Sequence, residues 1–413
     1  MITIEKPYVK KFKYKSKLFF NIIINKEKKK IWFEVDNKYA EYLCDDRVDA
    51  IVVGLLHYAM KNNHNIQSNS YITEELLYKI KTFLIPTLTK YDKRMHNINI
   101  DIKTKPACEN AGGVGTGCSC GVDSLYSYLS NNKTNIKQFK LTHLCINSVG
   151  AFNETYKDEG VEKVKNERYK KSIEFAKEVN LPLIITNSNF LEEIYQVHYY
   201  THTYSSTFAI LCLQKLWKTY YYGSSGCDFS TFSVYDNAEH DCANYELLSL
   251  NCFSTNNLII YSDGGAKDRL EKTKYIYKDK LTKKYLHVCL KKAYNCGICD
   301  KCRRTLLSLY ALGANIEEYN NIFDTKYFLK NKEEYFDWIY KEHIWNNEMI
   351  ESIYEMLKND KDFKNYLKKQ EDRNKNDLID YKKEYEKIIN SKSFKLGNAI
   401  MKIPRKLKRI INK

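Results

Sequence analysis

Four cysteines near position 290 have the spacing of a metal site. Cys289, Cys296, Cys299 and Cys302 form a Cys-x6-Cys-x2-Cys-x2-Cys array, and Gly297 allows a tight turn between them. Thiolates at these intervals can converge on one tetrahedral Zn²⁺ and leave no coordination position for water. The array therefore predicts a structural zinc site, with an iron–sulfur cluster and redox-active thiols as the alternatives.

A short loop is the second segment with the residue types for chemistry, and its sequence is Ser119-Cys120-Gly121-Val122-Asp123-Ser124. It follows a predicted small-residue strand (Val114 to Cys118) and opens a predicted helix, whose N-terminal N–H groups suit a phosphate. The hydroxyls of Ser119 and Ser124 would add hydrogen bonds, and Asp123 would hold a Mg²⁺ ion that bridges the phosphates. The alternative is a structural turn in which Asp123 caps an ordinary helix.

The loop resembles the PP-loop signature Ser-Gly-Gly-x-Asp-Ser of the ATP pyrophosphatases, with Cys120 in place of the usual first glycine. The resemblance implies that residues 119–124 bind ATP and that its cleavage between the α and β phosphates activates a substrate as the adenylate. In this family the end of the next strand contacts adenine, which points to Asn147 and Ser148.

Both motifs together resemble the 7-cyano-7-deazaguanine synthase group over roughly residues 106 to 312, where the cysteine array is followed by Arg303 and Arg304. In that group the zinc is structural. ATP activates a carboxylate, which ammonia converts first to an amide and then to a nitrile.

Several polar residues between the two motifs are candidates for supporting roles. Arg269 and Lys272 lie three apart at a predicted helix start, where they could neutralise charge as pyrophosphate leaves; a solvated basic face is the alternative. The stretch Tyr222 to Cys227 would line a substrate pocket at the carboxyl edge of a sheet. His202 is a candidate acid or base, although a lone histidine is more often structural. Three scattered cysteines are expected to be buried apolar residues: Cys227, Cys242 and Cys252.

Two segments must position these residues. We expect residues 1–105 to form a small α+β module. Apolar runs between residues 17 and 36 indicate a β-hairpin, and apolar residues recur at helical spacing over Arg47 to Met60 and Glu74 to Leu84. Over residues 106–315 strands and helices alternate, which predicts an α/β domain with a parallel sheet and helices on both faces. The resemblance implies that this domain has the HUP/PP-loop fold.

The chain after residue 315 predicts a helical region (316–390) and a basic amphipathic tail (391–413). The formal net charge is +16, and eight basic residues but no acidic residue follow position 390. Because half of the net charge lies in this tail, a domain that reads nucleic acid is not expected. The tail predicts contact with an anionic membrane surface and resembles the C-terminal ends of bacterial surface-polysaccharide enzymes, whereas a disordered solubilising tail is the alternative.

The start of the chain has no signal-peptide pattern, and no run reaches the roughly 18 apolar residues of a membrane span. We therefore expect a cytoplasmic, bacterial protein, peripheral at the inner face of the plasma membrane through its tail, whose thirteen cysteines stay reduced.

The combined prediction is an ATP-dependent adenylating enzyme with ATP, Mg²⁺ and structural Zn²⁺ as cofactors. It would activate a carboxylate or amide of a small-molecule or sugar acceptor for attack by ammonia or an amine, in surface-polysaccharide biosynthesis. One alternative is deazapurine synthesis or conjugation, and another is an inert nucleotide-binding scaffold. The sequence leaves a homo-oligomer open.

Overall fold

Eleven strands form one mixed sheet in the computed structural model, which describes residues 1–150, 161–224, 229–234, 241–289 and 291–394. Among these residues, six of the ten strand pairings are parallel. The strands are β1 (Ile2–Ile4), β2 (Tyr8–Lys11), β3 (Lys15–Ile24), β4 (Glu27–Asp36), β5 (Ile66–Thr73), β6 (Ile100–Lys105), β7 (Gly113–Gly117), β8 (His143–Ser148), β9 (Leu183–Ser188), β10 (Trp217–Gly223) and β11 (Ile259–Asp263).

The last five strands are all parallel and lie in the order β9-β8-β7-β10-β11. The chain builds outward from β7 to β9 and then returns to place β10 on the other side of β7. Parallel sheets with this reversal bind ligands in the crevice beyond the carboxyl ends of the two central strands. We therefore expect a ligand site at the carboxyl ends of β7 and β10.

Strand β7 is made of small residues because its neighbours approach closely. A Cβ atom at Gly115 would lie 2.8 Å from the Trp217 ring of β10, and one at Gly113 would lie 2.8 Å from the Leu216 carbonyl oxygen. Glycine at both positions lets β10 pack beside β7.

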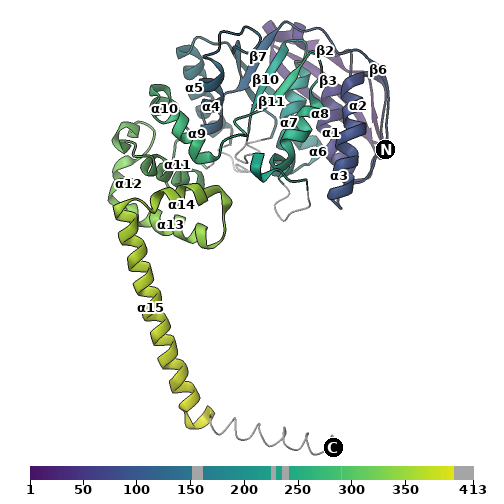
Figure 1. Ribbon diagram of the computed structural model, residues 1–413. Coiled ribbons are helices and arrows are strands. Elements are labelled where there is room, and N and C mark those ends of the chain that lie inside the picture. The colour runs from purple at the N-terminus through teal and green to yellow at the C-terminus, as the bar shows by residue number, and fades with distance from the viewer. Residues whose placement is uncertain (151–160, 225–228, 235–240, 290, 395–413) are drawn as a thin grey trace, which may run out of the picture.

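Helices cover both faces of the parallel part (Figure 1). One face carries α4 (Val122–Asn131), α5 (Val161–Glu178), α9 (Arg269–Ile276) and α10 (Lys280–Tyr285), and the other carries α1 (Asp49–Lys61), α6 (Phe190–Ile194), α7 (His198–Cys212) and α8 (Glu246–Phe253). Side chains of adjacent residues in β10 enter different clusters, since Tyr220 belongs to the core around α7 and Tyr221 to the core around α4. The predicted α/β class is confirmed.

The strands of residues 106–315 pair in parallel, as predicted, but the N-terminal strands continue the same sheet and make it mixed. Strand β4 pairs antiparallel with β9, so the predicted hairpin, β3–β4, and the other N-terminal strands extend the same sheet. Phe20 and Phe33 of this hairpin pack against Phe208 of α7, and this shared core holds the hairpin at the edge of β9. Helix α2 (Glu74–Lys79), a π-helical turn η2 (Ile80–Leu84) and α3 (Ile85–Tyr91) complete this part.

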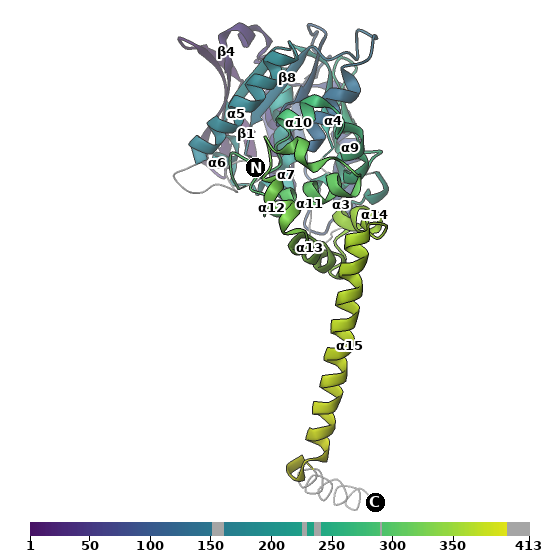
Figure 2. The same cartoon turned by 90° about the vertical axis from the view of Figure 1, so that its left-hand side faces the viewer.

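The region after residue 315 is helical, as predicted. It contains α12 (Thr325–Lys330), α13 (Lys332–Ile344), α14 (Glu351–Leu357) and α15 (Lys361–Asn390), packed beside α11 (Asp300–Ala311). Helix α15 extends away from the body in both views (Figures 1 and 2). The short 3-10 helices are η1 (Asn37–Tyr42), η3 (Phe229–Thr231), η4 (Cys242–Tyr245), η5 (Ile316–Tyr319) and η6 (Glu348–Ile350).

Most of the predicted basic tail, residues 395–413, lies outside the described residues. None of the helices in the described ranges combines the length and the apolar character that crossing a bilayer requires.

Candidate functional site

A cavity of about 390 Å³ lies at the carboxyl ends of β7, β8 and β10 and is called the loop cavity below. Its wall includes three residues of the predicted phosphate-binding loop, Ser119, Asp123 and Ser124. Arg168 of α5 and Lys301 of α11 bring positive charge to the same space. The structure thus places the predicted loop at the reversal point of the sheet, as the strand order requires.

The loop leads into α4 without a side-chain cap. Gly121 is the N-cap residue in an extended conformation, and its own N–H contacts the Ser119 hydroxyl at 3.3 Å. The alternative in which Asp123 caps the helix is therefore wrong, since Asp123 lies inside the first turn. The uncapped first turn keeps N–H donors for an anion.

Asp123 is bonded to both predicted basic residues. Arg269 Nη1 lies 2.8 Å from Asp123 Oδ2, and Lys272 Nζ lies 3.3 Å from Asp123 Oδ1. Lys272 is fully buried and also donates to the Ser224 carbonyl oxygen at 3.0 Å. Burial would raise the pKa of the Asp123 carboxyl, but the charges of Arg269 and Lys272 outweigh it and lower that pKa to about 2. The basic pair is thus bonded to a residue of the cavity wall and is not a solvated face, while neither Arg269 nor Lys272 is among the described residues that line the loop cavity.

Cys120, the residue that departs from the family signature, has a left-handed backbone with φ of 57°. Its side chain is fully buried, with its sulfur 3.9 Å from Ser172 Oγ, and its carbonyl oxygen accepts a 2.8 Å hydrogen bond from the His287 N–H. The loop thus keeps a conformation that glycine adopts more easily. Val122 is buried at the start of α4.

Of the two residues expected near adenine, one lines the loop cavity and the other does not. Asn147 lines the loop cavity, where its amide nitrogen lies 3.3 Å from the Tyr220 hydroxyl and its oxygen accepts from Thr186 Oγ1 at 3.1 Å. Ser148 is not among the described residues that line this cavity. Only Asn147 is positioned to contact a ligand there.

The four predicted metal ligands come together in the segment after α10 and in the first turn of α11, and we call them the cysteine cluster. Their sulfur atoms all lie within 4.8 Å of one another, and those of Cys289 and Cys299 are 3.9 Å apart. Backbone N–H groups of Lys291 and Cys299 each contact a cluster sulfur at 3.4 Å, and Gly297 has φ of 74°. Four converging thiols with N–H donors form a set that could bind a metal such as zinc.

The cysteine cluster is joined to the loop cavity. The N–H of His287, two residues before Cys289, donates to the Cys120 carbonyl oxygen, and Lys301, between two of the cysteines, lines the cavity. Asn295 holds the intervening turn, because its amide group bonds to Val288 N, Cys289 N and the Leu286 oxygen. A metal in the cluster would therefore fix a part of the cavity wall.

His202 lies in a hydrogen-bonded network behind the cavity wall. Its Nδ1 lies 2.8 Å from the Tyr222 hydroxyl, and its Nε2 lies 2.9 Å from Asp241 Oδ1. Burial would lower the pKa of His202, but Cys242, Tyr222 and Asp241 outweigh this and raise it. Tyr222 lines the loop cavity, whereas the last three residues of the predicted pocket stretch, 225–227, which include Cys227, lie outside the described residues.

Several residues of the cavity wall were not found from the sequence, among them Arg168, Ser172 and Lys301. Arg168 and Ser172 face the cavity from successive turns of α5, but nothing in that Lys-rich segment distinguishes them. Lys301 could have been predicted from the sequence. It lies between two metal-ligand positions, Cys299 and Cys302, whose geometry restricts where its side chain can point.

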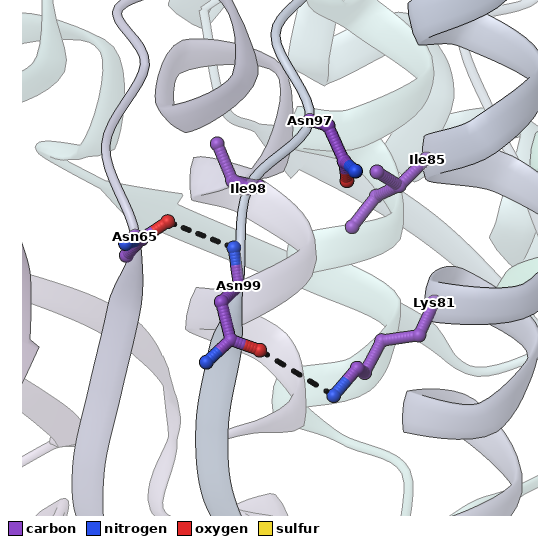
Figure 3. A pocket seen from close by; sticks show the side chains of 6 residues that line it. All are labelled: Asn65, Lys81, Ile85, Asn97, Ile98 and Asn99. Atoms are coloured by element: carbon purple, nitrogen blue, oxygen red, sulfur yellow. Dashed lines mark hydrogen bonds between the residues drawn. The ribbon is translucent and has the colours of Figure 1, made fainter.

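A second cavity, of about 340 Å³, lies at the amino ends of β5 and β6 (Figure 3). There Asn65 Oδ1 accepts from the Asn99 N–H at 2.8 Å, and Lys81 Nζ lies 3.5 Å from Asn99 Oδ1. Among the residues that the structure describes, its wall contains none of the predicted site residues and a single charged side chain, Lys81. The loop cavity is therefore the better candidate for catalysis.

The residues of the loop cavity and the cysteine cluster are the basis for assigning a function. Comparisons of the chain with models of protein families, with curated proteins and with solved structures found no match.

Proposed function

We propose that this chain is a PP-loop ATP pyrophosphatase that adenylates a small acceptor in the loop cavity. The observation that carries the proposal is the uncapped start of α4, which opens at the strand reversal beside Arg168 and Lys301. A volume of about 390 Å³ lies within the roughly 300–1,000 Å³ usual for small-molecule sites. The strand order β9-β8-β7-β10-β11 supports the HUP-type fold that this assignment implies.

The reaction would proceed in two displacements. A carboxylate or amide oxygen of the acceptor attacks the α-phosphorus of ATP, and the bond to the bridging oxygen breaks so that pyrophosphate leaves with the electron pair. Ammonia or an amine then attacks the activated carbon, a C–N bond forms, AMP leaves and the nitrogen loses a proton. The N–H groups of α4, with Arg168 and Lys301, would stabilise charge on the phosphates.

Asp123 supplies oxygen atoms of the kind that Mg²⁺ prefers. Arg269 and Lys272 now bind both of its oxygen atoms, so holding Mg²⁺ requires these cations to turn from the carboxylate toward the phosphates. Mg²⁺ would supply charge neutralisation on the triphosphate. An exchange of partners of this kind would place all three predicted residues at the leaving pyrophosphate.

The acceptor side of the cavity is aromatic and polar. Tyr220, Tyr221 and Tyr222 line it together with the hydroxyl-bearing side chains Ser172 and Ser206. Phenol rings and hydroxyl groups suit a sugar or another polar ring. These features support a small-molecule or sugar acceptor and, with the basic tail, the proposed place in surface-polysaccharide biosynthesis.

The test is ATP binding and product analysis on the full-length protein loaded with Zn²⁺ and Mg²⁺. Calorimetry should detect ATP binding. Asp123→Ala should weaken it at least about tenfold, because Mg²⁺ bound to ATP loses its contact with the Asp123 carboxylate. Asp101→Ala, at an exposed position of β6, is the matched control and should bind ATP normally. Absence of ATP binding by the wild-type protein would remove the proposal.

Product analysis separates the enzyme from an inert scaffold. Incubation with ATP and a panel of nucleotide-sugars and deazapurine acids should release AMP and pyrophosphate with at least one acceptor, and the class that responds identifies the chemistry. Release of ADP and phosphate instead would contradict cleavage between the α and β phosphates.

A further inference from the structure

Three side chains of metal-ligating type meet in a second place, behind Tyr222. His202 belongs to α7, Asp241 precedes η4 and Cys242 begins η4. One donor atom from each lies within 4.8 Å of the other two. His202 and Asp241 are 39 residues apart in the chain, so the fold and not local sequence brings this set together.

Each of the three side chains is also held by a further group. Tyr222 OH bonds to His202 Nδ1 at 2.8 Å, which leaves Nε2 directed at the other two residues. The Ala243 N–H donates to Asp241 Oδ1 at 2.8 Å, and the Thr203 N–H contacts Cys242 Sγ at 3.4 Å. Metal ligands in proteins are oriented by outer contacts of this kind.

The three side chains are also largely removed from solvent. Cys242 is fully buried, and the side chains of His202 and Asp241 are 12% and 13% exposed. The three donor atoms thus meet in a largely buried place, where polar side chains are either paired with one another or coordinate a metal.

We propose that His202 Nε2, an Asp241 carboxylate oxygen and Cys242 Sγ bind a second divalent metal ion of the Zn²⁺ class. A nitrogen, oxygen and sulfur set suits Zn²⁺ in preference to Mg²⁺ or Ca²⁺, which select oxygen. Three protein ligands leave a fourth position for water, in contrast to the closed cysteine cluster.

The ion would act on the loop cavity through Tyr222. None of its three ligands is among the described cavity-lining residues, but Tyr222 is, and it bonds to the ring nitrogen of His202 that faces away from the ion. Metal binding would fix the imidazole and thereby the Tyr222 hydroxyl at the acceptor side. Metal binding does not require ATP, so this site and the adenylating activity can fail independently.

The test is metal stoichiometry of the full-length protein after saturation with Zn²⁺ and removal of unbound ion. The wild-type protein should retain two equivalents, whereas His202→Gln and Cys242→Ser should each retain one. Cys296→Ser should also retain one, and the Cys296→Ser/Cys242→Ser double variant none. Loading with Co²⁺ should produce two sets of absorption bands, of which Cys242→Ser removes only the weaker, single-thiolate set.

Cys252→Ala is the matched control, because Cys252 is a buried thiol of α8 outside both groups, and it should keep two equivalents. Circular dichroism establishes that each variant is folded. A wild-type protein that holds one equivalent, lost on Cys296→Ser, would overturn the proposal and leave His202 and Asp241 as a hydrogen-bonded pair. Retention of two equivalents by folded His202→Gln would overturn it equally.

Discussion

The cysteine cluster and the loop cavity lie against each other, but they are assembled differently. All four cluster thiols come from residues 289–302, and backbone N–H groups of the same segment contact them. The loop cavity takes its wall from β7, β8, β10 and from helices before and after them. The cluster is a local structure that a metal can complete, whereas the cavity exists only when the sheet is formed.

This difference predicts a one-way dependence between them. The cluster needs little from the sheet beyond the docking bond from His287 N to the Cys120 carbonyl oxygen. The cavity needs the cluster to place Lys301 in its wall. Loss of the metal should therefore damage the cavity while the sheet persists.

Removal of the metal should have the largest effect. Cys296 is the most exposed of the four cysteines, so Cys296→Ser removes a ligand with little loss of packing. Because structural zinc contributes on the order of 10 kcal/mol to the folding of small metal domains, residues 286–312 should lose hydrogen-exchange protection. The parallel strands should stay protected, and ATP affinity should fall at least about tenfold with the loss of a charged contact. Exchange followed by mass spectrometry measures the first two effects.

Cys108→Ser is the control for that experiment, since Cys108 is a half-buried thiol outside the cluster. It should leave zinc content and exchange unchanged. Equal loss of protection in β7 and in residues 286–312 would show that the two regions fold as one unit and would contradict the one-way dependence.

A smaller effect is expected for the cationic side chain that the cluster contributes. Lys301→Met keeps most of the apolar stem and removes the ammonium group. A charge-assisted hydrogen bond is worth about 1.5–3 kcal/mol, so ATP affinity should fall roughly 10- to 100-fold while zinc content stays the same. Lys283→Met, whose ammonium pairs with Glu318 outside the cavity, is the matched control. Loss of zinc from Lys301→Met would mean that the charge supports the cluster and not the ligand.

The same distinction explains what the sequence could predict. The cysteine array and the loop motif could be predicted because each lies within a short segment, where the number of residues between side chains limits how far apart they can lie. The β3–β4 hairpin and the helical C-terminal region were accessible from periodicity for the same reason. The pairing of β4 with β9 was not, since the choice of edge depends on Phe20 and Phe33 packing against Phe208.

Site residues that come together from distant segments could not be predicted, for a related reason. Arg168 is one of many basic residues in its helix, and only the fold selects it. Asp241 and Cys242 meet His202 through tertiary packing, so Cys242 was expected to be an ordinary buried residue, and its burial alone was anticipated correctly. Arg269 and Lys272 were identified, but their present partner is Asp123 and not a phosphate.

The smallest expected effect concerns the one point where the loop conflicts with its own residue type. Cys120 at φ of 57° carries a left-handed penalty of about 1–2 kcal/mol, which glycine avoids. Cys120→Ala removes the sulfur and keeps the penalty, while Cys120→Gly removes both, at a cost of roughly 0.5–1 kcal/mol in unfolded-state entropy. Urea unfolding should therefore rank Cys120→Gly above Cys120→Ala by up to about 1.5 kcal/mol, with ATP affinity in both close to wild type. The opposite ranking would mean that the left-handed conformation of Cys120 does not strain the loop.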